Sequence, residues 1–153
     1  MPNARVGRIG GRLGPVTDLD AETIEFAHRM FDLARAGDTA ELAANIAAGL
    51  PANLTNSKGD TLLILAAYHN HPDTVRALLA GGADPDRVND RGQTALAAAV
   101  FRQNPQTVRI LLAAGADPQA GGPSAMATAE FFKLPEMAAL LRGDTPTGPP
   151  TQA

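Results

Sequence analysis

Hydrophobic residues in the middle of the chain fall into short blocks with helical spacing, separated by proline and glycine. The block at 75–79 has Val and Leu at positions i, i+3 and i+4, which predicts a helix with one buried face. Pro72 suits the first turn of this helix, and Gly82 suits a left-handed residue that ends it. A preceding block of Leu and Ala follows Thr61, a favourable N-cap, and predicts another short helix. The pattern therefore predicts a helix–turn–helix unit.

This unit occurs twice, at 56–88 and 89–121, with a period of 33 residues. The matching positions are the threonine caps, the helix-starting prolines, the leucine pairs and the closing turns: Thr61 and Thr94, Pro72 and Pro105, Leu78-Leu79 and Leu111-Leu112, 82–85 and 115–118. A helix pair of this size cannot bury both of its faces alone. The units are therefore expected to stack side by side.

Weaker versions of the unit flank the two clear copies and are expected to cap the stack. Residues 18–55 begin with a longer helix predicted over 20–36, with one face formed by Ile24, Ala27, Phe31 and Ala34. Asp38 and Glu41 then have the spacing of a capping box at the start of a second helix. Residues 122–143 contain a shortened helix pair.

Composition and charge exclude several classes of function. The 153 residues include 13 basic and 16 acidic side chains, and the net charge of −3 disfavours a general nucleic-acid binder. There is no cysteine, and no apolar run reaches the roughly 18 residues that a membrane helix requires. Residues 1–17 are rich in Gly and Arg and predict a flexible arm, and the Pro/Thr-rich residues 144–153 predict a disordered tail. This leaves 18–143 as the folded domain.

The repeated unit resembles the ankyrin repeat. The family pattern G-x-T-P-L-H-x-A-A is matched in part at 59–67 and 92–100, and V-x-x-L-L and G-A-D follow in both copies. The resemblance implies an all-α solenoid of about four stacked units, including the degenerate end caps. The proline and histidine of the pattern are replaced, by Leu62 and Ile64 in the first copy. The Thr–His hydrogen-bond network between repeats is therefore expected to be missing.

The resemblance also implies a non-enzymatic module that binds another protein through its concave face. Candidate contact positions are the residues that follow the Ala-Ala pair, together with the hairpin side: Tyr68, His69, Phe101, Arg102, Phe131, Ser57, Asp60, Val88, Asp90 and Gln93. Aromatic and arginine side chains are frequent interface hot spots. An alternative is that Phe101 and Phe131 pack between the inner helices as core, which is the expectation for Phe132.

Single motifs in the chain do not favour other chemistries. His69 and His71 are close in sequence, but their positions at a helix end and a helix cap predict side chains that diverge, so no metal site is expected. Asp84 and Asp117 are expected to form turns rather than to bind calcium. A small ligand-binding or hydrolytic protein on the same scaffold remains the alternative, and stoichiometric masking of a partner is a third possibility. The sequence favours a cytoplasmic, bacterial protein that is monomeric by itself and needs no cofactor.

Overall fold

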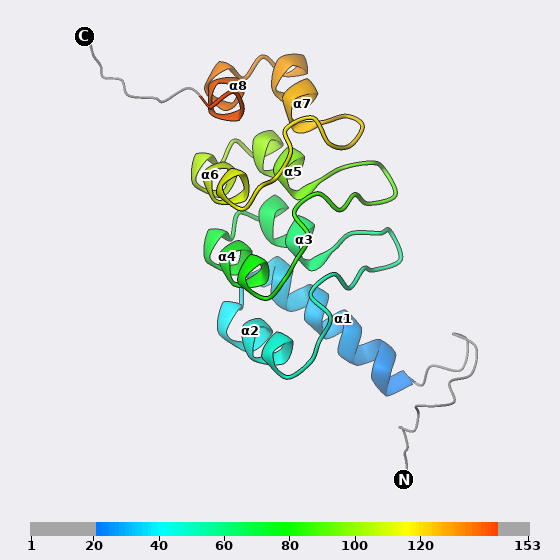
Figure 1. Ribbon diagram of the computed structural model, residues 1–153. Helices are drawn as coiled ribbons and strands as arrows, with labels where there is room; N and C mark the ends of the chain where they lie inside the picture. The colour runs from blue at the N-terminus through cyan, green and yellow to red at the C-terminus, as the bar shows by residue number, and fades with distance from the viewer. Residues whose placement is uncertain (1–20, 144–153) are drawn as a thin grey trace.

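The computed structural model describes residues 21–143, which form a stack of α-helices (Figure 1). The helices are α1 (Ala21–Ala36), α2 (Thr39–Ala47), α3 (Leu62–Tyr68), α4 (Pro72–Ala80), α5 (Ala95–Phe101), α6 (Pro105–Ala113), α7 (Ala125–Phe131) and α8 (Pro135–Leu141). Within this part of the chain there is no strand, only isolated bridges at two loops. The predicted arm (1–17) and tail (144–153) lie outside the described residues.

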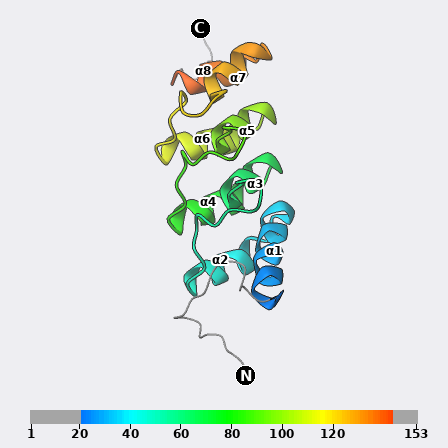
Figure 2. The same cartoon turned by 90° about the vertical axis from the view of Figure 1, so that its right-hand side faces the viewer.

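The helices form two layers, which Figure 2 shows as two columns. The inner layer contains α1, α3, α5 and α7, and the outer layer contains α2, α4, α6 and α8. Each inner helix packs on the next inner helix and on its own outer helix. The loops between units project to one side of the stack (Figure 1). The all-α solenoid expected from the sequence is confirmed.

The predicted helix starts are confirmed by their hydrogen bonds. The side-chain oxygens of Thr61, Thr94 and Ser124 each accept a hydrogen bond at 3.0 Å from the backbone N–H three residues later. These bonds satisfy amides that have no partner within the helix. Pro72 and Pro105 stand in the first turn of their helices, where an amide donor is not needed. Polar caps therefore fix where α3, α5 and α7 begin, and prolines suit the first turns of α4 and α6.

Alanine and leucine form the core between the layers. The inner helix α3 is buried along its whole length except for its last residue, Tyr68. Ala66 and Ala99, at equivalent positions of α3 and α5, are fully buried. Such small side chains permit close helix packing, and the leucines of the outer helices fill the remaining space. This explains how the chain forms a continuous core with so few aromatic residues.

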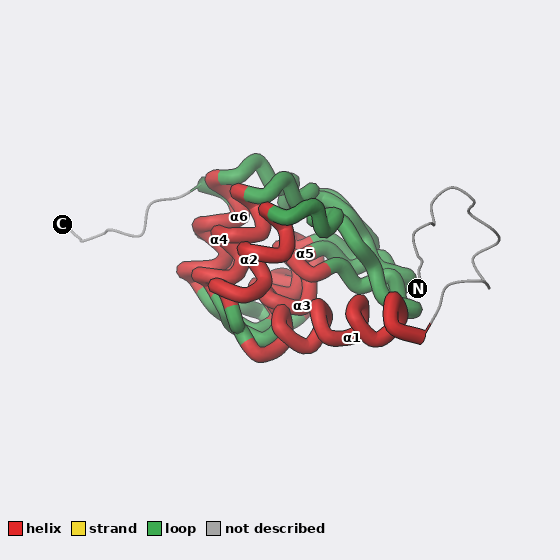
Figure 3. The backbone as a smooth tube through the Cα atoms, turned by 90° about the horizontal axis from the view of Figure 1, so that it is seen from below, coloured by secondary structure: helices red, strands yellow, loops and turns green. Residues whose placement is uncertain are grey.

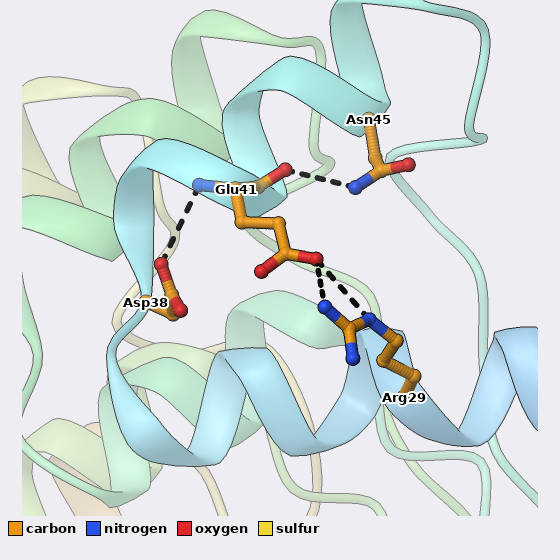
Figure 4. Close-up of polar contacts among 4 residues, drawn as sticks. All are labelled: Arg29, Asp38, Glu41 and Asn45. Atoms are coloured by element: carbon orange, nitrogen blue, oxygen red, sulfur yellow. Dashed lines mark hydrogen bonds and ion pairs between the residues drawn. The ribbon is translucent and has the colours of Figure 1, made fainter.

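The expected capping box of α2 is only half correct (Figure 4). An Asp38 carboxylate oxygen accepts a long hydrogen bond, 3.5 Å, from the Glu41 backbone N–H. The Glu41 carboxylate, however, does not return to the cap. It accepts hydrogen bonds from the Arg29 guanidinium of α1, with Nε at 3.1 Å, and this bond and charge raise the pKa of Arg29. An ion pair between helices thus replaces the local contact.

The N-terminal half of α1 also departs from the expectation. Phe31 and Ala34 are buried as predicted, but Ile24 is 43% exposed. The reason is the length of α1, which has 16 residues where α3 has 7. Its first turns run beyond the inner layer toward the loops (Figure 3).

Candidate protein-binding groove

The inner helices and the loops between units enclose a groove of about 1270 Å³. One wall comes from α3 and α5, and the opposite wall comes from the hairpin loops around 54–60 and 91–93. One side of α1, from Thr23 to Arg35, lines one end, and Thr128 and Phe132 line the other. The groove therefore follows the stacking direction over several units.

Aromatic rings form a continuous row where the inner helices end. We call Tyr68, Phe101, Phe132 and Phe131 the aromatic column. The Tyr68 and Phe101 rings are nearly parallel with centroids 6.4 Å apart, and Phe132 contacts Phe101 edge to face at 5.4 Å. Phe131 meets Phe132 edge to face at 4.9 Å. Such offset and edge contacts are favourable arrangements of aromatic rings and order the column without a ligand.

The expectation that Phe132 is a core residue is wrong, as is the alternative that Phe101 and Phe131 are core. Phe101 is 46% exposed, Phe132 48% and Phe131 78%, compared with 39% for Tyr68. The last unit follows at a spacing of 30 residues rather than 33, as Pro105 and Pro135 show. This places Phe132 at the C-cap of α7, the position that is equivalent to Arg102 after α5.

Charged and polar groups border the aromatic column. The Arg102 guanidinium lies over the Tyr68 ring, 5.1 Å from its centroid, in a cation–π contact. The edge of the Tyr68 ring also meets His69, with centroids 5.2 Å apart. Burial, followed by the positive charges of His71, Arg35 and Arg102, lowers the pKa of His69. His69 is therefore predominantly neutral at pH 7.

On the hairpin side, two basic residues occupy the same place in successive loops. We call Lys58 and Arg91, which are 33 residues apart and both exposed, the basic row. The Arg91 guanidinium donates to the Gln93 side-chain oxygen, with Nη2 at 3.0 Å. Within residues 21–143 neither Lys58 nor Arg91 forms an ion pair. The basic row thus presents uncompensated positive charge to the groove.

Asp60, a predicted contact residue, is a structural residue instead. It is only 8% exposed, and its carboxylate accepts a 2.8 Å hydrogen bond from the buried Asn89 side chain of the next loop. The Asn89 side-chain oxygen in turn accepts from the backbone N–H groups of Arg91 and Gln93, both at 2.9 Å. This network holds the two loops together and fixes the position of the basic row.

The backbones of neighbouring loops also meet directly. The Asp90 N–H donates to the Lys58 carbonyl at 3.0 Å, and the Gly122 N–H donates to the Gly92 carbonyl at 2.9 Å. Gly92 has a φ of 77°, and a Cβ on it would lie 2.6 Å from the Gly122 oxygen. Glycine is therefore required at this position by both conformation and space.

Residues 30–121 match the model of ankyrin repeats in three copies, and this match covers more than half of the chain. The chain belongs to the ankyrin repeat family. An ankyrin repeat protein of Pseudomonas aeruginosa is 56% identical over 62 residues, which is 40% of this chain and 36% of that protein. The chain thus matches about a third of the length of this relative. No helix of the described ankyrin domain is long and apolar enough to cross a membrane.

Six of the predicted contact residues line the groove of this ankyrin stack, and four do not. Those that line it are Tyr68, His69, Phe101, Ser57, Asp60 and Gln93; those beside it are Arg102, Phe131, Val88 and Asp90. Sequence reasoning missed Lys58 and Arg91, although their shared place in the ankyrin period was visible. It also missed the groove-facing side of α1, which the period does not cover.

The histidines and turn aspartates of the ankyrin domain have structural contacts. The His71 ring does not cap α4; its Nε2 bonds to the Arg35 carbonyl of α1 at 2.7 Å. Asp84 and Asp117 each accept a 2.9 Å bond from the backbone N–H two residues later, as expected of turn formers. Among the described residues no group of His, Asp or Glu is placed to hold a metal ion.

Proposed function

We propose that this ankyrin protein is a non-enzymatic interaction module that holds its partner protein in the groove. Ankyrin repeats generally mediate protein–protein interaction. The observation that carries the proposal is the aromatic column, because it places four of the six aromatic residues of the chain together on an exposed surface. A contiguous exposed patch of large apolar side chains is costly in water and marks an interaction site.

The geometry of the column supports tight contact. Tyr68 and Phe101 are ordered by each other, and Arg102 is ordered by Tyr68. A partner that covers them therefore loses little additional side-chain entropy in the complex. Tyrosine and arginine are also the residue types that dominate interface energetics. We infer that these residues form the centre of the interface.

The polar residues along the hairpins form the rim of the proposed interface. Ser57 and Gln93 line the groove, whereas Val88 and Asp90 are exposed beside it. Rim contacts contribute little to affinity and mainly exclude water from the centre. Asp60 is left out of the interface because its carboxylate is buried against Asn89. We propose that the protein is a cytoplasmic monomer, and that it acts by binding its partner and masking the bound surface.

Selection from a display library of random peptides on the immobilised full chain tests this function. The wild-type chain is expected to enrich a consistent set of peptides. Tyr68→Ala with Arg102→Ala is expected to lose that set while its helical circular dichroism and melting temperature stay the same, because both side chains are exposed. The matched control is Arg76→Ala with Arg109→Ala, which removes two exposed arginines from the outer helices. Equal enrichment by the variant that lacks Tyr68 and Arg102 would show that this surface does not bind the partner.

A further inference from the structure

The groove has a sign of charge opposite to that of the whole chain. The charged side chains that line it are Arg35, Lys58 and Arg91, with Asp60 as the acidic member. Asp60 is buried and bonded to Asn89, so its carboxylate is not available to a ligand. The accessible charge in the groove is therefore positive, in a protein whose net charge is −3.

The positive charge is concentrated on the hairpin wall. Arg35 is already compensated, because it forms an ion pair with Asp32 at 2.8 Å. Lys58 and Arg91 have no carboxylate partner among the described residues, and Asp90 does not line the groove. The basic row lies along one wall of the groove, and three rings of the aromatic column, those of Tyr68, Phe101 and Phe132, line the other.

We propose that the groove takes an extended acidic segment of the partner protein, with carboxylates against the basic row and apolar side chains against the aromatic column. The proposal rests on the proposed function and adds the chemistry of the partner. Successive side chains of an extended strand point to opposite sides. A strand that alternates acidic and apolar residues can therefore contact both walls of the groove at once.

The spacing within the column agrees with a strand. The centroids of Tyr68 and Phe101 are 6.4 Å apart. Alternate residues of an extended strand are separated by roughly 6.6 Å, so two successive apolar side chains can each meet one ring. A single-stranded nucleic acid is disfavoured because the acidic remainder of the chain repels a phosphate backbone, which requires many cationic contacts.

Fluorescence anisotropy with three labelled peptides on the full chain tests the proposal. The peptides alternate leucine with glutamate, with glutamine or with lysine, and labelled oligothymidine is a fourth probe. The glutamate peptide is expected to bind at least about tenfold more tightly than the glutamine peptide, with an advantage that salt weakens. Equal binding of these two peptides, or tighter binding of oligothymidine, would overturn the acidic-segment proposal.

Charge reversal provides the sharper test. Lys58→Glu with Arg91→Glu is expected to lose the glutamate peptide and to gain the lysine peptide, a gain that an unfolded variant cannot produce. Arg76→Glu with Arg109→Glu introduces the same charge change at the same spacing on the outer helices and is expected to retain the wild-type preference. If the control changes preference as much as the groove variant, net charge and not the groove determines binding.

The two proposals fail in different ways. If the glutamine peptide binds as well as the glutamate peptide and Tyr68→Ala with Arg102→Ala removes both, the groove binds protein without selecting acidic segments. If none of the three peptides binds to the wild-type chain and library selection enriches nothing, both proposals are wrong.

Discussion

The two central repeats, 56–88 and 89–121, have the same packing residues and different groove residues. Val75 and Leu78 of the first repeat and Val108 and Leu111 of the second are all fully buried. At the ends of the inner helices, Tyr68-His69 of the first repeat corresponds to Phe101-Arg102 of the second. The packing residues are thus the same in the two repeats, whereas the residues at the ends of their inner helices differ and can define a binding preference.

The largest expected effect tests whether the two packing sites are equivalent. Leu78→Ala and Leu111→Ala each remove a fully buried side chain between helix layers. Each is expected to lower the free energy of unfolding by about 2–5 kcal/mol, since the rigid neighbours leave a cavity. Urea unfolding followed by circular dichroism measures this. A midpoint that moves for only one variant would show that the two repeats are not packed alike.

A smaller effect is expected where the loops of the two repeats meet their neighbours. Gly59 and Gly92 both have a φ of 77°. A Cβ on Gly92 would lie 2.6 Å from the backbone oxygen of Gly122, whereas the closest atom to a Cβ on Gly59 is a side-chain oxygen of Asp90, at 2.5 Å. The backbone at Gly122 cannot rotate away from a new Cβ, whereas the Asp90 side chain can. The Asp90 backbone nitrogen, at 2.9 Å from a Cβ on Gly59, still limits the space there.

Gly92→Ala is therefore expected to lower the free energy of unfolding by roughly 2–3 kcal/mol, and Gly59→Ala by somewhat less. Gly115→Ala is the matched control, because Gly115 also has a positive φ but has open space around its Cα. Thermal unfolding of the three variants checks the order. A larger loss for Gly115→Ala would mean that backbone strain, and not loop contact, sets the cost.

Local signals in the sequence predicted the elements of the fold. Threonine caps, helix-starting prolines and the spacing of Val75 and Leu78 act over a few residues, so the period of 33 located α3–α6 without a structure. The expectation for Phe132 is wrong because the last unit breaks that period: Pro135 follows Pro105 after 30 residues, which gives Phe132 the place of Arg102. The burial of Asp60 depends on Asn89 in the next loop, and no short-range signal reports such a contact.

Two threonines at equivalent positions of the repeats differ in whether their buried hydroxyl is hydrogen-bonded. Thr74 and Thr107 hold the same place in α4 and α6 and are 1% and 0% exposed. The Thr74 Oγ1 shares a 2.7 Å hydrogen bond with the Oγ1 of Thr39 in the preceding unit. The residue 33 positions after Thr39 is Pro72, which has no hydroxyl to offer Thr107. The Thr107 Oγ1 has no hydrogen-bond partner among the described residues.

The smallest predicted effects are therefore opposite in sign. Thr74→Val breaks a hydrogen bond and is expected to cost about 1 kcal/mol of unfolding free energy, while Thr107→Val removes an unsatisfied buried oxygen and is expected to add about 1 kcal/mol. Valine replaces the hydroxyl with a methyl group of similar size, so both changes report mainly the presence or absence of the hydroxyl. Paired urea titrations measure both. Thr39→Val is a third variant that should lose at least as much stability as Thr74→Val, because it also removes a 3.4 Å bond to the Gly37 carbonyl. A loss of stability in Thr107→Val would show that its hydroxyl is hydrogen-bonded in solution, and the two repeats would then be alike in this respect as well.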